Sequence, residues 1–358
     1  MLSIDEIKKN DSADMLSVLK AFPEQLAKAV ELAKDFKGFA QAKPASQDIV
    51  VLGMGGSAIG GDLLRNFMAY SGIKNKVKVT VSRDYELPHF VDDKTNIICS
   101  SYSGNTEETL TAVKEALKIT KRIVCITTGG ELLEFAKSNE LPFILIPAGL
   151  QPRCAVGYSI IPMLYTVLNS GFVIKAEAKK ASNSIESVIE LAKELSADFS
   201  QYEQPNIAVT IAEMIKNTVP VIYSSDKFYA ANLRWRCQIQ ENSKSIAYGN
   251  VLPEMNHNEI NSFDQPADVI ERLSMIVMND DMDHPRTKIR FEAIKEILED
   301  KVETIIELTA SSDDYLAKVI EYLYLGDWVS YYMAILQNID PTPIPLITKL
   351  KNILAEAK

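Results

Sequence analysis

The sequence Ser-Ser-Tyr-Ser-Gly-Asn-Thr-Glu-Glu-Thr, residues 100–109, joins a run of hydroxyl side chains to the acidic first turn of a helix. It follows the apolar run 95–99, which predicts a buried strand, and precedes the amphipathic pattern 109–118, which predicts a helix. A helix N-terminus presents unpaired backbone N–H groups and a partial positive charge, so it binds anions without a lysine. The turn therefore predicts an anion site, to which side-chain donors are added by Ser101, Ser103 and Thr106.

These residues also suit an ordinary turn and helix cap, so the prediction depends on a second loop. Gly-Met-Gly-Gly-Ser-Ala-Ile-Gly-Gly, residues 53–61, follows the apolar run 48–53 and precedes a helix that we expect to begin at Asp62. Glycines let the backbone approach an anion closely, and Ser57 adds a hydroxyl. Two such loops at the carboxyl ends of strands fit one compact phosphate at a switch point of the sheet.

A dinucleotide-binding loop is the alternative interpretation of residues 53–61. Gly53, Gly55 and Ala58 match the pattern G-x-G-x-x-A, which is weak by itself. A Rossmann domain also needs an acidic residue about 20 positions further on to hold a ribose. The acidic residues Asp84 and Glu86 lie further away and past the second strand, which disfavours a nicotinamide cofactor.

Apolar runs alternate with helical patterns along the chain and predict an α/β fold with mainly parallel sheets. A length of 358 residues exceeds that of most single cores, so two domains are expected. Helices are predicted over the first 45 or so residues, 176–200, 314–336 and a short terminal segment. Strands are predicted at 48–53, 77–81, 96–99, 122–127 and 143–146 in the first half, and at 219–223, 273–278 and 302–308 in the second.

Composition limits the partners that this protein can have. The net charge is −10 and no dense lysine or arginine run occurs, so we expect neither nucleic acid nor a membrane surface as a partner. The four cysteines form no CxxC pair, which is typical of reduced thiols in the cytoplasm. We expect no secretion signal and no membrane span, because no apolar run reaches eighteen residues.

The loops GMGGSAIGG and SSYSGNTEET together resemble the signature loops of the sugar isomerase (SIS) domain. Their order and spacing resemble the family of bifunctional phosphoglucose/phosphomannose isomerases, and the resemblance covers essentially the whole chain. It implies two tandem SIS-type three-layer αβα domains: residues 1–170 with the phosphate loops, and residues 171–358 with the base, a histidine and the C-terminal helix. It also implies that the sugar phosphate is held by Gly55, Gly56, Ser57, Ser101, Ser103 and Thr106.

Aldose–ketose isomerisation needs a base that reaches C1 and C2 and a group that opens the sugar ring. Glu241-Asn242, followed by Lys244, resembles the base-bearing motif of the family, although composition alone suggests an exposed glutamate in the last turn of a helix. His257 resembles the ring-opening histidine, which in this superfamily reaches the site from a neighbouring subunit. The resemblance therefore implies a homodimer.

Two further catalytic residues follow from the resemblance. Arg153 lies in the loop where the family places an arginine that stabilises the enediolate. Lys351 resembles the C-terminal lysine that assists ring opening, with Lys349 close enough to be the alternative. Thr342 is expected to shape the substrate pocket.

The implied reaction interconverts glucose 6-phosphate and mannose 6-phosphate with fructose 6-phosphate and needs no cofactor or metal. His89 looks like a loop residue. The segment Asp280-Asp-Met-Asp-His284 could supply metal ligands, but acidic residues are common at a helix start, so we assign no metal there.

The main rival is a sugar-phosphate sensor that uses the SIS fold only to bind, which would lack the base and histidine and carry a DNA-binding segment. An amidotransferase-linked aminosugar synthase is disfavoured, because no cysteine-nucleophile domain precedes the two α/β units in this sequence.

Overall fold

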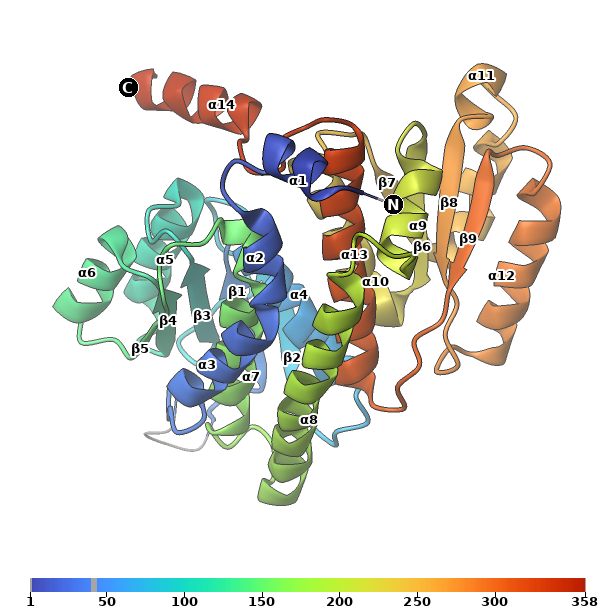
Figure 1. The fold of residues 1–358 in the computed structure, drawn as a ribbon. Coiled ribbons are helices and arrows are strands. Elements are labelled where there is room, and N and C mark those ends of the chain that lie inside the picture. Colours follow the sequence, from blue (N-terminus) through green and yellow to red (C-terminus); the bar gives the residue numbers. More distant parts are fainter. Residues whose placement is uncertain (1, 40–43, 358) are drawn as a thin grey trace.

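The structure is a computed structural model that describes residues 2–39 and 44–357. Two parallel sheets lie on either side of a central layer of helices, as Figure 1 shows. Residues 40–43, at the end of the segment that we expected to be helical, lie outside the described part. The amino-terminal helices are α1 (Ile4–Asn10), α2 (Met15–Lys20) and α3 (Phe22–Ala33).

The first sheet is built from the five strands predicted in the first half of the chain. Its strands are parallel and their order is β2-β1-β3-β4-β5. From β1 the chain adds β2 on one side and then β3, β4 and β5 on the other, so the order of strands reverses between β1 and β3. The bounds are β1 (Asp48–Leu52), β2 (Lys78–Ser82), β3 (Asn96–Ser101), β4 (Ile123–Thr127) and β5 (Phe143–Leu145).

The second sheet has the order β7-β6-β8-β9 and is also parallel. Three of its strands were predicted. The edge strand β7 (Tyr248–Leu252) was not, because Gly249 and Asn250 interrupt its apolar pattern and Tyr248 is exposed. The other strands are β6 (Val219–Ser225), β8 (Leu273–Met278) and β9 (Thr304–Leu308).

Alternating side chains divide each sheet between two cores. In β1, Ile49 and Val51 join the large central core, whereas Val50 and Leu52 face the other side. The second sheet follows the same rule, and its inner face contributes to the same central core. Both halves are thus three-layer αβα units that share their middle layer, which confirms the predicted fold class.

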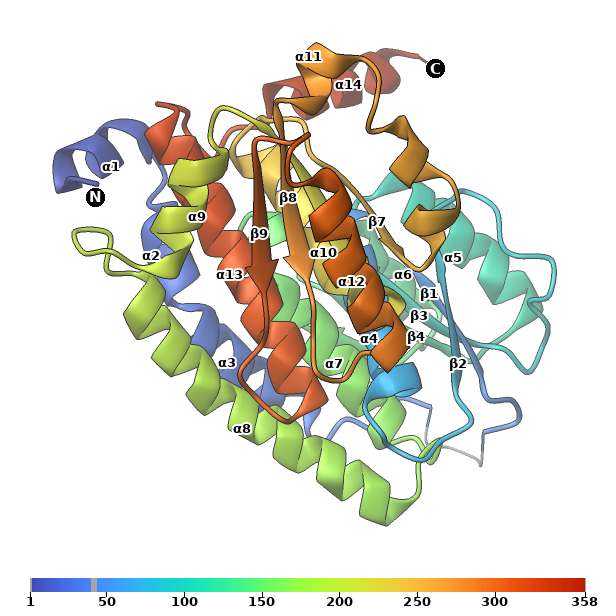
Figure 2. The ribbon, with the colours of Figure 1, turned by 90° about the vertical axis from the view of Figure 1, so that its right-hand side faces the viewer.

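The helices fill the layers of these units (Figure 2). In the first half, α4 (Gly55–Tyr70) and α7 (Val156–Leu168) pack with α3 on the inner face, and α5 (Glu107–Ile119) and α6 (Gly130–Ser138) cover the outer face. In the second half, α10 and α13 cover the inner face and α12 the outer face. The remaining bounds are α8 (Lys175–Phe199), α9 (Ile207–Ile215), α10 (Tyr229–Asn242), α11 (Ala267–Ile270), α12 (Pro285–Leu298), α13 (Tyr315–Leu336) and α14 (Pro345–Glu356), with short 3-10 turns η1 (Pro152–Cys154), η2 (Asp226–Phe228), η3 (Glu254–His257) and η4 (Glu259–Ser262).

Residues 53–61 were predicted wrongly as a loop, with the helix beginning only at Asp62. Helix α4 begins at Gly55, so most of the segment forms its first two turns. The glycines are needed for close packing rather than for a flexible loop, since a Cβ at Gly60 would collide with the Ser159 side chain of α7. Composition cannot separate these two uses of glycine.

Within residues 2–39 and 44–357, no helix is long and apolar enough to cross a membrane. The longest apolar helix, α13, is buried along most of its length between the two sheets. Its hydrophobic residues fill the shared core.

Candidate active site

The two loops predicted to bind an anion meet where the first sheet reverses its winding. Strands β1 and β3 are parallel neighbours, so the segments that follow them emerge at the same edge. The backbone N–H of Tyr102 donates to Ser57 Oγ at 3.3 Å and joins the two loops directly. This is the position at which open parallel sheets bind ligands.

Both helix N-termini at this edge lack a side-chain cap. Met54 precedes α4 and Thr106 precedes α5, and neither side chain accepts a hydrogen bond from its helix. The first backbone N–H groups of a helix have no intrahelical partner, so they are available to an anion placed between these ends.

Hydroxyl groups surround the same position. Ser101 Oγ and Thr106 Oγ1 share a hydrogen bond of 2.9 Å, and the N–H of Gly104 donates to Ser101 Oγ at 3.1 Å. Ser103 is exposed, and its hydroxyl accepts from the N–H of Asn105. The hydroxyl donors of both loops therefore lie at the same edge of the first sheet.

The glycine segment also touches the turn that carries Arg153. A Cβ at Gly56 would lie 2.8 Å from the carbonyl oxygen of Pro152, closer than real Cβ contacts. Only glycine lets the start of α4 approach η1 this closely. The packing brings the arginine beside the anion position.

Arg153 is buried and contacts two distant segments at once, the end of α10 and residues 341–342. Its Nε donates to Asn242 Oδ1 at 2.7 Å, and its Nη2 donates to the carbonyl oxygens of Pro341 at 2.7 Å and Thr342 at 2.8 Å. Its Nη1 lies 3.5 Å from Glu241 Oε2. The sequence positions 153, 241 and 342 thus meet at one place.

Two polar atoms in this cluster are buried without a hydrogen-bond partner among the described residues. They are Nη1 of Arg153 and Oγ1 of Thr342. A buried donor without a partner is costly, so such an atom is expected where a ligand completes the site. The side chain of Glu241 beside Arg153 is 28% exposed, so solvent reaches it.

A buried ion pair between Arg234 and Asp327 holds the backbone of Arg153. Arg234 donates to both carboxylate oxygens of Asp327, at 2.9 and 2.7 Å, and also to the backbone oxygen of Arg153 at 2.9 Å. Burial raises the pKa of Asp327, and the charge of Arg234 opposes that shift. Gln238 donates to the same carboxylate. This chain of contacts ties α13 and α10 to the position of Arg153.

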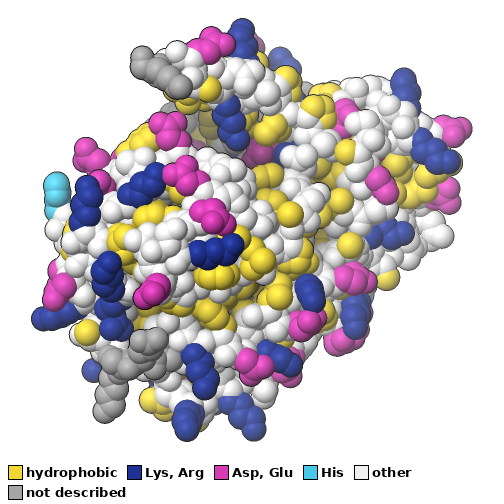
Figure 3. Space-filling view, turned by 90° about the vertical axis from the view of Figure 1, so that its left-hand side faces the viewer, with side chains coloured by type: hydrophobic (Ala, Val, Ile, Leu, Met, Phe, Trp, Pro, Cys, Tyr) yellow, Lys and Arg dark blue, Asp and Glu magenta, His cyan; other side chains and the backbone are white. Residues whose placement is uncertain are grey.

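The other two expected catalytic residues lie apart from this cluster. His257 is exposed at the end of η3, and among the described residues no hydrogen bond or ion pair joins it to Glu241 or Arg153. Lys351 and Lys349 are exposed on α14, none of whose residues is buried. Figure 3 shows α14 standing clear of the body of the molecule at the top of the view, above a hollow.

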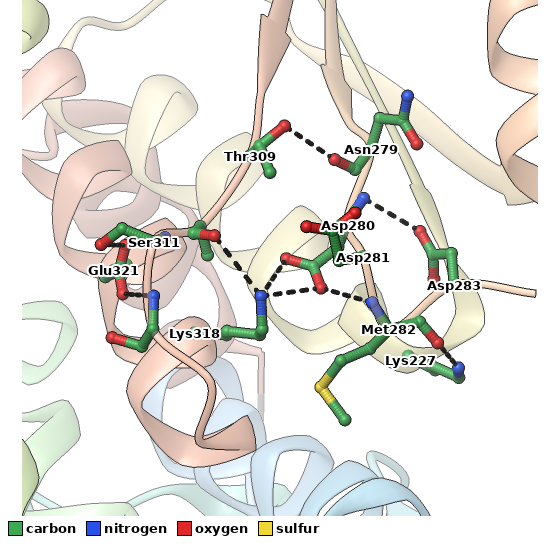
Figure 4. Close-up of polar contacts among 12 residues, drawn as sticks. Lys227, Asn279, Asp280, Asp281, Met282, Asp283, Thr309, Ser311, Lys318 and Glu321 are labelled. Carbon is green, nitrogen blue, oxygen red and sulfur yellow. Dashed lines mark hydrogen bonds and ion pairs between the residues drawn. The ribbon is translucent and has the colours of Figure 1, made fainter.

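The corresponding edge of the second sheet is filled by its own charged side chains (Figure 4). Lys318 on α13 pairs with the buried Asp280 at 3.0 Å. Asp281 pairs with Lys288 on α12, and the Asp283 carboxylate accepts from the N–H of Asp280. These carboxylates are therefore engaged within the protein. Among the described residues, no group of three or more His, Cys, Asp and Glu side chains could hold a metal ion.

His284 caps the next helix, its Nδ1 accepting from the N–H of Arg286 at 3.1 Å, and α12 begins at Pro285 as predicted. Sequence reasoning missed two supports of the site, Arg234 and Asp327, and it named Asn242 in the motif with Glu241 without assigning it the contact with Arg153. Asp327 was detectable, because a lone aspartate within an apolar helix needs a buried partner.

The fold and the paired loops define an α/β protein of the SIS class. Residues 204–354 match the family model of the bacterial phospho-glucose isomerase C-terminal SIS domain. Among solved structures, a hypothetical protein from Thermus thermophilus superposes with a TM-score of 0.69 at 17% identity, covering 99% of this chain and 92% of that chain. This likeness concerns the fold alone.

Curated relatives identify the family. The chain is 40% identical to a bifunctional phosphoglucose/phosphomannose isomerase of Caldicellulosiruptor bescii, over 94% of this chain and 97% of that protein. It is 36% identical to the Aquifex aeolicus protein of the same name, over 90% of this chain and 93% of that protein. This chain therefore belongs to the bifunctional phosphoglucose/phosphomannose isomerase family.

We predict that Thr106→Val weakens binding of inorganic phosphate about tenfold to a hundredfold, because it removes one donor to a charged group. Isothermal titration calorimetry measures the change. Thr111→Val is the matched control, since Thr111 lies on α5 and its side chain is exposed. An unchanged affinity of the Thr106 variant would remove this residue from the site.

Proposed function

We propose that this protein is an aldose–ketose isomerase that interconverts glucose 6-phosphate and mannose 6-phosphate with fructose 6-phosphate. Membership of the family supports this function, since the relatives with most of the chain in common carry that name. The proposal also needs a place for the phosphate and a base near an oxyanion donor. Both requirements can be checked against the geometry of the first sheet's edge.

One observation carries the proposal. A partly exposed carboxylate, Glu241, lies 3.5 Å from a buried guanidinium nitrogen of Arg153 that has no hydrogen-bond partner among the described residues. A base next to a reserved cationic donor suits a reaction in which proton removal creates an oxyanion. A protein that only bound sugar phosphates would not need this pair.

The phosphate is held by the N-termini of α4 and α5, with hydroxyls from Ser57, Ser101, Ser103 and Thr106 and backbone from Gly55 and Gly56. Glu241 removes the proton from C2 of the aldose and returns it at C1 of the enediolate, or the reverse. Arg153 stabilises the negative oxygen of that intermediate. Rotation about the C2–C3 bond lets one base serve both faces of C2, which accounts for two aldose products. Thr342 Oγ1, buried without a partner among the described residues, is available to a substrate hydroxyl.

Ring opening is assigned to His257 with Lys351, and we propose that His257 serves the site of a second subunit in a homodimer. Its exposure and its lack of contacts with Glu241 among the described residues support this arrangement. Exposed apolar side chains on α14 also favour contact with a second copy, among them Leu346, Leu350 and Ile353.

We place the boundary between the two SIS units at residues 170 and 171. The packing of α7 on α3 and α4 supports the assignment of α7 to the first unit. The four cysteines are free, which fits a reducing cytoplasm.

The function is tested by incubation of the protein with fructose 6-phosphate and identification of the products. We expect both glucose 6-phosphate and mannose 6-phosphate, separated by anion-exchange chromatography. A sugar-phosphate sensor would bind the sugar and yield neither product, which would refute the proposed activity. Tight binding of NAD would instead favour the dinucleotide interpretation of residues 53–61.

The base is tested by Glu241→Gln, which keeps the size of the side chain and removes its basicity. We expect kcat with fructose 6-phosphate to fall about a hundredfold or more, the range for loss of a general base. Glu296→Gln, an exposed substitution on α12, serves as the control and should leave kcat unchanged. Near-normal turnover of the Glu241 variant would show that another group is the base.

The shared site is tested by mixing inactive Glu241→Gln and His257→Ala subunits after partial dissociation. Random exchange gives half mixed dimers, each with one intact site, so activity should recover to about a quarter of wild type. Native mass spectrometry confirms the exchange. If mixed dimers form and remain inactive, His257 does not act across a subunit interface.

A further inference from the structure

The segment between α13 and α14 determines where the C-terminal helix α14 begins. It contains Asp340, Pro341 and Thr342, whose backbone oxygens face the end of α10 and the turn η1. Beyond it, every described residue of α14 is exposed or only partly covered. The position of α14 in this chain therefore depends on how this segment is held.

Two cations hold the segment from one side. Arg153 donates to the carbonyl oxygens of Pro341 and Thr342. Lys244 Nζ donates to the carbonyl oxygens of Asp340 at 2.8 Å, Pro341 at 2.8 Å and Asn242 at 3.1 Å. The oxygen of Pro341 accepts from both cations, so the proposed catalytic arginine and the lysine act on one peptide group.

The hydrogen bonds of Lys244 leave it no direct role with a substrate. An ammonium group has three N–H donors, and three carbonyl oxygens accept them here. Lys244 therefore links Asn242, which orients Arg153, to the segment that leads into α14.

The backbone of Lys244 points to a role for its side chain. Its φ of 53° lies in the left-handed region, which glycine adopts at no cost and other residues disfavour. A lysine at this position gives up some backbone stability, and the contacts of its ammonium group offset that loss.

We propose that Lys244 is a positioning residue that, together with Arg153, fastens residues 340–342 and so sets the position of α14, the helix that carries Lys351. This proposal rests on the proposed function for the role of Lys351, but the fastening itself does not. The hydrogen bonds of Lys244 go to Asn242, Asp340 and Pro341, so we expect its variants to bind phosphate at the loops of the first sheet as the wild type does.

The charge of the lysine is present at neutral pH. Burial lowers the pKa of Lys244 to about 8, and the neighbouring Arg153 charge adds to this shift, while Asp340 and Glu241 oppose it. The ammonium form, with all three donors, therefore predominates at pH 7. Kinetic comparisons belong at that pH.

Three variants separate positioning from stability. Lys244→Met removes the donors, Lys244→Arg keeps a cation, and Lys244→Gly removes the donors while relieving the left-handed backbone. We expect Met and Gly to lower kcat about tenfold to a hundredfold at pH 7 with KM within about threefold of wild type, because a small displacement of a catalytic group is that costly. The Lys244→Arg variant should keep most of the wild-type kcat. Lys193→Met, which removes an exposed ion pair on α8, is the control and should change neither kcat nor KM.

A double-mutant cycle tests whether Lys244 acts through Lys351. If it does, Lys244→Met should cost little further turnover in a Lys351→Met background. Independent, multiplying losses would overturn the proposal, and so would normal kcat in both the Met and the Gly variants.

Hydrogen exchange gives a readout that needs no activity. Mass spectrometry should show faster amide exchange over residues 337–344 in Lys244→Met than in wild type, and wild-type exchange in Lys244→Arg. Unchanged exchange in the Met variant would overturn the fastening even if turnover fell. If the wild-type protein does not isomerise fructose 6-phosphate, the proposed function fails, and the exchange result still decides the fastening.

Discussion

The buried guanidinium of Arg153 is the constraint on which the arrangement of the site depends. A buried charge must be paired and hydrogen-bonded, or the fold loses several kcal/mol. The partners of Arg153 come from the end of α10 and from the segment before α14, and its own backbone oxygen is held by Arg234. The hydrogen bonds of this one guanidinium therefore bring together the first half of the chain, the helix that bears Glu241 and the segment before α14.

The two sheets have the same order of strands along the chain, but the edges at the carboxyl ends of their strands differ in what fills them. In the first, small residues and uncapped helix ends leave backbone donors available beside Ser57. In the second, the equivalent edge is closed by the buried pair of Asp280 and Lys318. One edge thus keeps free backbone donors, where we propose that the phosphate binds, while the other edge is occupied by the protein's own ion pair.

Much of the fold was predictable because its signals are local. The strands of the first sheet and three of the second have continuous or alternating apolar residues, and α12 begins at the predicted Pro285. Strand β7 escaped prediction because an edge strand needs no apolar face, and the glycines of α4 were mistaken for a loop because their partner, α7, is distant in sequence. The roles of Asn242 and Asp327 in supporting Arg153 were not predicted for the same reason, since their partners are distant in sequence.

The sequence by itself determined the α/β class, the glycine-rich and hydroxyl-rich segments that follow two neighbouring strands and, through family resemblance, the identities of the candidate site residues. These depend on periodicity, glycine and hydroxyl content, and motif order, which are properties of short segments. Only the tertiary structure decided that Arg153 meets Glu241 at 3.5 Å, that Lys244 faces the segment before α14, and that His257 and Lys351 lie away from the pair. Those outcomes depend on hydrogen bonds and burial between segments about 90 to 190 residues apart, which no local pattern encodes.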